Sequence, residues 1–500
     1  MHDDTIAAIA TPLGEGGLAV IRVSGPEAFT VVDKIFQPSG KSSLKPSAAP
    51  THTVHYGKIV RQKPARPLTR PLDTLAPVGG EGRGEGDFQT IDEVLLSVLR
   101  APRTFTREDT VEISCHGGLL PAKLVLDTVL ENGARLAEPG EFTRRAFLNG
   151  RLDLAQAEAV ADLIHSRTEL ALAAANEQLA GKLSQRINQL RDEMMKTLAH
   201  VEAHIDFPDE DIAPETRAQL IQRLEKGAAF MDELLCTANE GQILRRGIRT
   251  AIVGRPNAGK SSLLNQLLGH DRAIVSHIAG TTRDTIEETA NIRGLPVVFI
   301  DTAGLREARD EIELEGIRRS RESLAKAELI LHVLDASEPL TPADETYLAE
   351  FAGKKRILVR NKTDLPVKLI LPLERRSPTR HESAAESRPA GSETGAPIVD
   401  VCCLRGQGME VLKDAIKDLV WAGKIEAGML QVMINSRHQE ALGRARVATL
   451  ETIAALRADL TLELVALDLR IAVNAVGEIV GKTATDDLLD SIFSQFCLGK

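Results

Sequence analysis

The stretch GRPNAGKSS, Gly254 to Ser262, constrains the fold more than any other part of this 500-residue chain. The apolar run TAIVG leads into it, and the helix-forming run SSLLNQLLG follows. A strand, a loop and a helix are the setting that the G-x-x-x-x-G-K-[ST] pattern requires. Such a loop turns backbone N–H groups toward phosphate oxygens, while Lys260 adds a positive charge and the Ser261 hydroxyl can bind Mg²⁺. The stretch therefore predicts a nucleoside triphosphate bound to a parallel α/β domain.

Two later stretches predict which base is bound. NKTD, Asn361 to Asp364, follows a predicted strand, and the Asp364 carboxylate can accept two N–H bonds from the edge of guanine. Adenine would leave a polar group unpaired there, at a cost of about 1–3 kcal/mol. In VCCLRG, Cys402 and Cys403 replace the usual Ser-Ala of the loop that packs on the base through its backbone. The predicted ligand is therefore GTP rather than ATP.

Two more stretches, DTAG at 301–304 and AGTTRD at 279–284, would complete the nucleotide site. We expect Asp301 to hold Mg²⁺ through water, the Gly304 N–H to sense the γ-phosphate and Thr282 to be a second Mg²⁺ ligand. Directly after DTAG, however, Ras-type GTPases carry the Gln that orients the attacking water, and this chain has Leu305. Hydrolysis would therefore need another polar residue and another positive charge.

The residues alone leave the replacement for that glutamine open. No arginine finger can be assigned from the sequence. A monovalent cation beside the phosphates is one candidate for the positive charge, and the Asn257 amide oxygen could bind it. Glu313, in REARDEIELEG, is one of several carboxylates that could polarise the water.

Three patterns of apolar residues indicate a multidomain α+β and α/β chain. Alternating apolar and polar residues predict a β-rich domain over 1–118, and helical stripes cover 119–245 and 424–500. Alternating strands and helices over 246–423 predict a parallel sheet with helices on both faces. Because both flanking stripes need an apolar partner, we expect one discontinuous helical domain with the α/β domain inserted. We expect two low-complexity insertions at the surface, one at 61–87 and one at 366–397. The first should be disordered and join the two strands of a hairpin.

Composition excludes several classes of protein. A net charge of −10 argues against a surface coated for nucleic acid but leaves room for a local basic site. The chain shows no apolar run long enough to span a membrane and no signal peptide, so we expect a cytoplasmic protein without a membrane anchor. The odd, scattered cysteines give no zinc spacing and no disulfide framework; they are Cys115, Cys236, Cys402, Cys403 and Cys497.

The chain ends in QFCLGK, with Cys497 as the fourth residue from the end. Prenylation needs two aliphatic residues and a permitted last residue, whereas this tail has Gly499 and Lys500. Metal binding lacks partners at a useful spacing. A packed thiol and a reactive thiol both remain, and free cysteines are more often buried.

Several motifs together resemble the MnmE (TrmE) family of tRNA-modification GTPases. The resemblance covers nearly the whole chain apart from the two insertions and rests on ATPLGEGGLAVIRVSG, FTREDTVEISCHGG, PGEFTRRAFLNGRLDLAQAEAVADLI, DFPDED, GRPNAGKSSLLN, IAGTTRDTIEE, DTAGLREARDEIELEGI and the terminal CLGK. It implies potassium-dependent GTP hydrolysis by G domains that dimerise. It places K⁺ among Asn257, Ser276, Ile278 and Thr281, and it implies that Glu313 is the catalytic residue that polarises water.

The resemblance also implies roles for the other domains. The N-terminal domain would be folate-binding-like, form a constitutive homodimer and bind a one-carbon tetrahydrofolate through Arg22, Glu108, Arg151 and Lys500. A flavoprotein partner of the MnmG (GidA) kind would carry FAD. As a heterotetramer, the two proteins would install a carboxymethylaminomethyl-type group on the wobble uridine of certain tRNAs. Cys497 becomes a catalytic-site residue, either as nucleophile or as structural support.

Motifs and resemblance together predict the nucleotide contacts. Mg²⁺ would be held by Ser261 and Thr282. The predicted GTP-binding residues are Asn257, Ala258, Gly259, Lys260, Ser261, Ser262, Ser276, His277, Ile278, Ala279, Gly280, Thr281, Thr282, Asp301, Thr302, Ala303, Gly304, Asn361, Lys362, Asp364, Cys402 and Cys403.

Two other functions compete with this one. A ribosome-assembly GTPase switch would share the phosphate loop and NKxD, but it usually appends a module rich in Lys and Arg. The segment 424–500 has neither a GxxG clamp nor a basic cluster, which disfavours that function. A stand-alone folate transferase with a regulatory GTPase fits the sequence, because the sequence does not assign each chemical step to a partner.

Overall fold

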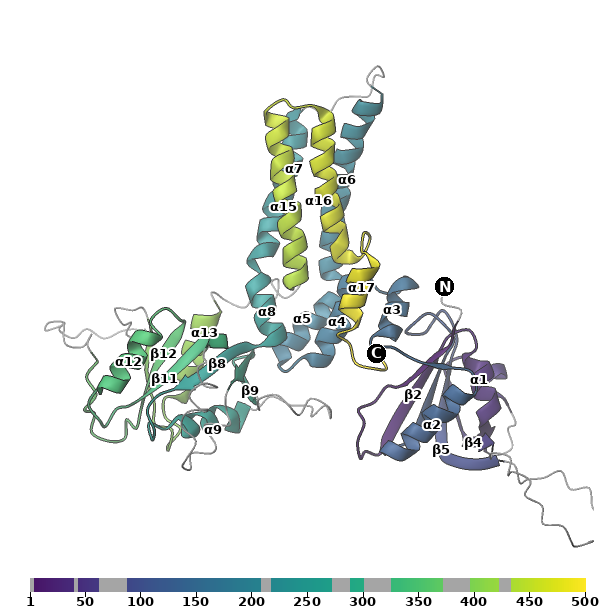
Figure 1. The fold of residues 1–500 in the computed structure, drawn as a ribbon, viewed down its shortest axis with the longest axis horizontal. Coiled ribbons are helices and arrows are strands. Elements are labelled where there is room, and N and C mark those ends of the chain that lie inside the picture. The colour runs from purple at the N-terminus through teal and green to yellow at the C-terminus, as the bar shows by residue number, and fades with distance from the viewer. Residues whose placement is uncertain are drawn as a thin grey trace, which may run out of the picture. The chain divides into compact units, whose positions relative to one another are not determined.

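The computed structural model shows two compact units (Figure 1). The N-terminal unit comprises Met1–Glu158 and Ala484–Lys500, and the central unit comprises Ala159–Thr483. Among the helices that the structure describes, none is long and apolar enough to cross a membrane. The described residues are 4–39, 44–62, 88–207, 217–271, 288–300, 325–371, 396–421 and 433–500.

A seven-stranded sheet forms the centre of the N-terminal unit, in the order β3-β4-β5-β6-β2-β1-β7. β1 and β7 are parallel, and the other neighbours are antiparallel. β4 and β5 form the predicted hairpin, but the insertion predicted at 61–87 begins too early, because Arg61 and Gln62 still pair with β5; residues 63–87 lie outside the described part. Alternation buries Ile21 and Val23 of β2 and turns Arg22 to the opposite face. The strands are β1 (Ile6–Ile9), β2 (Leu18–Ser24), β3 (Phe36–Pro38), β4 (Thr53–Gln62), β5 (Phe88–Leu99), β6 (Thr110–His116) and β7 (Arg135–Leu136).

Two helices, α1 and α2, cover one face of this sheet. Val32 of α1 and Val125 of α2 join the apolar core of the strands. On the other face, Phe142 of α3 packs against Ile6 of β1, and α17 contacts α3. The helices of this unit are α1 (Ala28–Ile35), the short 3₁₀ helix η1 (Pro46–Ala48), α2 (Leu119–Glu131), α3 (Glu141–Leu148) and α17 (Asp486–Phe493).

The structure differs from the predicted domain boundary. Residues 119–158 and 484–500 belong to the N-terminal unit, although the sequence assigns them to the helical domain. α2 buries its apolar face on the β-sheet, and β7 pairs with β1. A helical stripe indicates that a segment needs an apolar partner but does not identify the partner, so the pattern alone misplaces the boundary.

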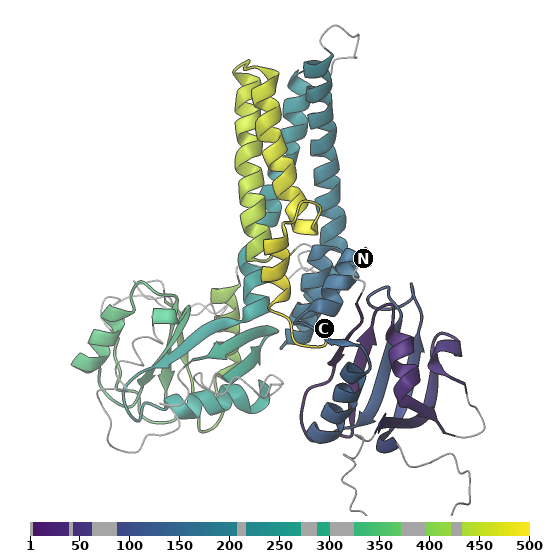
Figure 2. The same cartoon turned by 45° about the vertical axis from the view of Figure 1, so that its right-hand side comes forward.

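Four long helices of the central unit, α6, α7, α15 and α16, lie side by side (Figure 2). α6 packs on α16 and α7 on α15, so segments from before and after the α/β part share one core, as predicted. The stripe predicted on α6 is buried at Leu183, Ile187, Leu190, Met194 and Val201. The helices of this helical part are α4 (Leu154–His165), which crosses the division between the units, α5 (Glu169–Leu179), α6 (Lys182–Asp206), α7 (Arg217–Cys236), α8 (Ala238–Arg246), α15 (Ser436–Arg457) and α16 (Leu462–Val480).

The rest of the central unit, the nucleotide part, has a six-stranded sheet in the order β13-β12-β11-β8-β10-β9. Five strands are parallel, and the edge strand β9 is antiparallel to β10. α9 and α13 bury Leu263 and Leu412 on one face, and α12 packs Tyr347 on the other, which confirms helices on both faces. Its elements are β8 (Ile248–Val253), α9 (Lys260–Asp271), β9 (Glu288–Ile292), β10 (Leu295–Phe299), β11 (Leu329–Asp335), α12 (Pro342–Glu350), β12 (Arg356–Asn361), β13 (Ile398–Asp400) and α13 (Met409–Val420).

The second insertion is shorter than predicted. The sequence places it at 366–397, yet Leu369, Leu371 and Ala396 are buried in one apolar cluster beside the sheet. Residues 372–395 lie outside the described part. The apolar run around the two leucines, Val367 to Leu373, is short and interrupted by Lys368 and Pro372, so it shows no clear helix or strand period, and the prediction placed it in the insertion.

Candidate functional site

Two glycines with positive φ shape the loop between β8 and α9. Gly254 has φ +149°, and a Cβ there would lie 2.3 Å from the carbonyl oxygen of Val333. Gly259 has φ +100°, and a Cβ there would lie 2.0 Å from Nδ2 of Asn361. Only glycine fits both positions, so the loop can wrap closely against the ends of β11 and β12.

Lys260, the first residue of α9, is folded onto this loop. Its Nζ donates to the carbonyl oxygens of Gly254 at 2.9 Å and Arg255 at 2.7 Å. Burial lowers the pKa of Lys260. A phosphate oxygen that replaced these carbonyls would gain a charge-assisted hydrogen bond from a partly desolvated amine.

Asn361, at the end of β12, joins three of the predicted motifs. Its buried side chain donates Nδ2–H to the Ala258 carbonyl at 2.9 Å and accepts the Cys403 N–H at 3.1 Å. Gln266 of α9 donates to the Cys403 carbonyl at 2.9 Å. The phosphate loop, NKTD and the VCCL loop are therefore fixed to one another by hydrogen bonds.

These segments line one cleft, with a volume of about 1030 Å³. This volume is ample for a nucleotide, since ligand pockets commonly measure about 300–1,000 Å³. Asp364, predicted to read the base, lies in it and is exposed. The cleft is lined by Pro256, Asn257, Gly259, Lys260, Ser261, Ser262, Asn265, Gln266, Asn361, Lys362, Asp364, Leu365, Cys402, Cys403 and Leu404.

The two cysteines of the cleft are buried. Burial, with a smaller effect of the neighbouring Cys402, raises the pKa of Cys403 to about 11. Its thiol is therefore neutral at physiological pH and behaves as a small apolar side chain. Cys403 contributes its backbone N–H and carbonyl to the hydrogen bonds above, in line with a loop that works through its backbone.

The other predicted nucleotide and cation residues lie outside the described part of the chain. Asn257 and Ser261, predicted for K⁺ and Mg²⁺, both line the cleft. Within the described ranges, no group of three or more His, Cys, Asp or Glu side chains is arranged to hold a metal. The residues outside are Ser276, His277, Ile278, Ala279, Gly280, Thr281, Thr282, Asp301, Thr302, Ala303, Gly304 and Glu313.

A second candidate site surrounds the Phe105 ring in the N-terminal unit. The guanidinium carbons of Arg22 and Arg151 lie 5.9 Å and 5.1 Å from the ring centroid. Arg22 pairs with Glu112 at 2.8 Å and donates to the Gly499 carbonyl at 3.4 Å. Two of the predicted folate residues therefore share one aromatic ring, and the C-terminal tail reaches the same place.

Glu108, a third predicted folate residue, belongs to a polar network beside this ring. It accepts from Ser24 Oγ at 2.9 Å and from Arg145 at 3.4 Å. The fully buried Arg145 side chain also pairs with Asp4 at 2.7 Å and Glu141 at 2.9 Å. Burial would raise the pKa of Glu141, but hydrogen bonds from its arginine partners outweigh that effect and hold the pKa below its usual value.

The tail is seated on the backbone of the N-terminal unit. Gly499 has φ +86°, and a Cβ there would lie 2.4 Å from the Ile9 carbonyl oxygen. The Gly140 N–H donates to the Cys497 carbonyl at 3.4 Å. The Cys497 side chain is exposed and Lys500 is half-buried. The packed thiol that the residues alone favoured is therefore wrong for Cys497, and its role as nucleophile or support stays a prediction.

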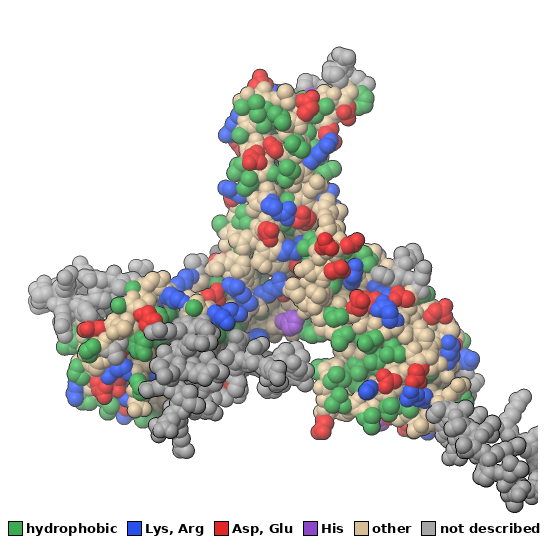
Figure 3. Space-filling model, viewed as in Figure 1, with side chains coloured by type: hydrophobic (Ala, Val, Ile, Leu, Met, Phe, Trp, Pro, Cys, Tyr) green, Lys and Arg blue, Asp and Glu red, His purple; other side chains and the backbone are tan. Residues whose placement is uncertain are grey.

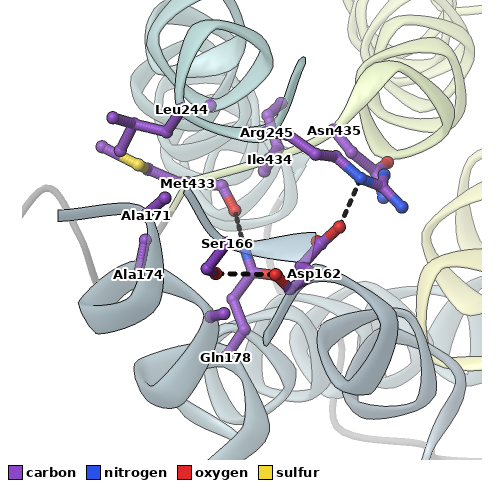
Figure 4. A pocket seen from close by; sticks show the side chains of 12 residues that line it. Asp162, Ser166, Ala171, Ala174, Gln178, Leu244, Arg245, Met433, Ile434 and Asn435 are labelled. Atoms are coloured by element: carbon purple, nitrogen blue, oxygen red, sulfur yellow. Dashed lines mark hydrogen bonds and ion pairs between the residues drawn. The ribbon is translucent and has the colours of Figure 1, made fainter. Parts of the chain in front are cut away.

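A smaller pocket of the central unit appears in Figure 4. Asp162 pairs with Arg245 at 2.5 Å, and Gln178 donates to the Met433 carbonyl at 2.7 Å. Its volume of about 30 Å³ suits water molecules only, since one water needs roughly 10–15 Å³ by this measure. The pocket joins α4, α5 and α8 to the segment that enters α15 and is not a ligand site.

Sequence reasoning missed four residues that organise the two sites. Arg145 lies in the motif PGEFTRRAFLNG, but nothing in the spacing separates it from its neighbour Arg144. Its partners come from distant parts of the chain, so only the fold reveals its burial. The missed residues are Phe105, Glu112, Arg145 and Gln266.

Comparisons with known proteins agree along the whole chain. A family model described as the MnmE helical domain matches residues 154–497, and one described as the GTP-binding protein TrmE N-terminus matches residues 5–151. The tRNA modification GTPase MnmE of Geobacillus kaustophilus is 46% identical over 499 residues, or 99% of each chain. That of Listeria innocua is 46% identical over 501 residues, or 100% of each chain. The two matched ranges meet close to Glu158, where the structure divides the chain, and not at 118, whereas the helical-domain model also covers 484–497, which the structure places in the N-terminal unit.

Proposed function

The chain belongs to the MnmE family of tRNA modification GTPases, and we propose that it hydrolyses GTP to drive the modification of tRNA. The observation that carries the proposal is the cleft in which Lys260, Asn361, Asp364 and the Cys402–Cys403 loop come together. The alternative, a ribosome-assembly switch, has no feature of the described structure in its favour.

We further propose the roles of the residues in the cleft. Lys260 exchanges its two carbonyl partners for phosphate oxygens, and Asp364 accepts from the guanine edge. Ser261, with Thr282, would hold Mg²⁺, and Asn257, with Ser276, Ile278 and Thr281, would hold K⁺. The bound cations would neutralise charge that develops on the phosphates. Glu313 would polarise the attacking water.

A one-carbon tetrahydrofolate is the ligand we propose for the second site. The Phe105 ring with two arginines suits a flat, partly anionic molecule. The Glu108 carboxylate can accept N–H bonds, and Arg22, Arg151 and Lys500 supply positive charge. Cys497, exposed on the tail, would act there as nucleophile or support, in a complex with an MnmG-like protein that carries FAD.

A homodimer, also part of the proposal, would cover one face of the N-terminal sheet. That face leaves large apolar side chains in water: Leu18 is 65% exposed, Val54 63%, Tyr56 52% and Leu95 46%. Tyr56 and Leu95 are direct partners across β4 and β5. Contiguous apolar surface of this kind usually marks an interface. We propose the cytoplasm as the location.

Nucleoside mass spectrometry of tRNA tests the proposal. A strain without this chain should lose the wobble-uridine modification, and the intact gene should restore it, whereas Lys260→Ala should not. The purified protein should turn over GTP much faster in K⁺ than in Na⁺. Unchanged tRNA in the deletion strain would refute the tRNA function, and equal rates in the two salts would remove the K⁺ site.

A further inference from the structure

Most of the arginine side chains that the structure describes on the central unit are paired with carboxylates. Arg470 pairs with Glu202 at 2.7 Å, and Arg293 pairs with Asp414 at 2.7 Å. On the face of the helical part shown in Figure 3, basic and acidic side chains are interspersed. Paired charges of this kind offer a polyanion little net attraction. Binding a polyanion such as tRNA therefore calls for cations that have no carboxylate partner.

Three exposed arginines of the N-terminal unit, in contrast, are not paired with a carboxylate of the described part of the chain. Arg107 donates to the Asn149 carbonyl at 2.9 Å, and Arg151 donates to the Thr104 carbonyl at 2.6 Å. Arg103 has no side-chain partner among the residues that the structure describes. Carbonyl oxygens orient a guanidinium but leave its full charge available, so these groups retain their attraction for an anion.

The three arginines belong to two segments that are fastened together. Asn149 donates its side-chain amide to the Thr106 carbonyl at 2.7 Å, and Thr104 donates its hydroxyl to the Glu108 carbonyl at 2.7 Å. Burial, and then the nearby positive charge of Arg107, lower the pKa of Arg151. The two guanidinium groups are therefore close enough for each to disfavour the charged form of the other.

The backbone at Arg107 supports a functional reason for this arrangement. Its φ is +61°, in the left-handed region that residues other than glycine seldom adopt. Such strain persists where the surroundings impose it and is concentrated at binding sites. In this backbone conformation, the Arg107 side chain reaches Asn149 and Gly150, which directly precede Arg151 in the chain.

We propose that Arg103, Arg107 and Arg151 bind backbone phosphates of tRNA at the edge of the Phe105 site. The inference rests on the proposed function, because a base that receives a one-carbon unit at this site brings its flanking phosphates close to it. Arginine is the side chain best suited to phosphate, and aromatic rings with arginines are common in the binding of single-stranded RNA. Phosphate contacts of this kind position the RNA without reading its sequence.

The test is equilibrium binding of the full-length protein to fluorescently labelled tRNA from a strain that lacks the chain, over a series of salt concentrations. The variants are Arg107→Ala and the double variant Arg103→Ala, Arg107→Ala. Arg151 is left intact because it also belongs to the proposed folate site. Lys123→Ala, an exposed cation of α2, is the matched control.

We expect the double variant to bind tRNA at least fivefold more weakly at low salt. The slope of log affinity against log salt should fall by about 0.7–0.9 for each phosphate that the variant no longer neutralises. Lys123→Ala should bind like the unaltered protein, and all variants should hydrolyse GTP normally. Unchanged affinity and slope in the double variant would overturn the proposal, as would a loss of tetrahydrofolate binding with tRNA binding intact. If the unaltered protein bound no tRNA, the proposed function would fail as well.

Discussion

The side-chain amide of Asn361 donates a hydrogen bond to the Ala258 carbonyl over 2.9 Å. The donor is both the last residue of β12 and the first residue of the base-recognition motif NKTD, and the acceptor lies in the phosphate loop. Both groups are buried, so the bond is shielded from water. One amide therefore sets the distance between the two halves of the nucleotide cleft before any nucleotide arrives.

Asn361→Asp should weaken GTP binding at least tenfold. The carboxylate keeps the shape of the amide and can still accept the Cys403 N–H, but it cannot donate to Ala258. A buried carbonyl left facing an oxygen costs about 1–3 kcal/mol. Thr363→Val, which removes the hydroxyl bond to the Val401 carbonyl in the same motif, is the control and should stay within a few-fold. Titration calorimetry measures both, and equal affinity of Asn361→Asp and the unaltered protein would contradict the role.

Gly499→Ala should detach the C-terminal tail. A methyl group at this position would lie 2.4 Å from the Ile9 carbonyl oxygen, and φ at +86° disfavours alanine further. We expect tRNA modification in cells to fall at least tenfold, with GTP turnover unchanged. Leu498→Ala, at a side chain that is 55% exposed, should modify tRNA normally. Full tRNA modification by the Gly499→Ala protein would mean that the contact of the tail with Ile9 is not needed for the reaction.

Cys497→Ser should abolish tRNA modification and leave folding and GTP hydrolysis near normal. The side chain is exposed, so its loss removes no core packing. Cys236, the other exposed cysteine, provides the matched control in Cys236→Ser. Nucleoside mass spectrometry and GTP turnover read the two effects separately. An active Cys497→Ser protein would exclude the nucleophile.

Arg145→Met should destabilise the N-terminal unit by about 3 kcal/mol, because it removes a fully buried cation, leaves Glu108 without its arginine partner and leaves Asp4 and Glu141 with Arg135 alone. The neighbouring Arg144 pairs with Asp490, whose side chain is 63% exposed. Arg144→Met should therefore cost no more than about 1 kcal/mol. Hydrogen exchange across a urea series, followed on peptides from β1 and α3, measures both variants. Similar losses of stability in the two variants would show that burial does not determine how much the Arg145 charge stabilises the unit.

The sequence predicts the nucleotide cleft well because its chemistry is local. The phosphate loop needs glycine at fixed positions between a strand and a helix, so a nine-residue pattern specifies both the loop and its neighbours. The order of strands and helices then requires a parallel sheet. The two flanking helical segments also had to meet, since each carries an apolar stripe that needs a partner.

The N-terminal unit was harder to predict because its site is assembled from distant segments. Arg145 draws its partners from Asp4 and Glu108, and Gly499 approaches Ile9. No spacing in the sequence encodes these contacts. The apolar stripe of α2 would suit a helix or a sheet equally well, so pattern alone could not assign that helix to the β-rich unit.

His332, in the middle of β11, is fully buried, and its ring is nearly perpendicular to that of Tyr347, with 6.2 Å between the ring centroids. Neither ring nitrogen has a hydrogen-bond partner among the described residues. Burial lowers the pKa of His332 to about 4. The folded protein therefore keeps the ring neutral at a pH where the unfolded chain, with a pKa near 6.5, takes up a proton.

The nucleotide part should consequently lose stability as the pH falls below about 6.5, until the folded form also protonates near its lowered pKa. Between pH 7.5 and 5.0, His332 should account for about 2 kcal/mol of that loss, and His332→Leu should lack this share. Trp421, the single tryptophan, is buried in the core of the nucleotide part, so its fluorescence during urea unfolding reports this part of the chain. Both proteins contain the carboxylates that titrate over the same pH range, so the contribution of those carboxylates cancels in the difference between the two proteins. If both lost equal stability between the two pH values, protonation of His332 would not be what weakens the fold.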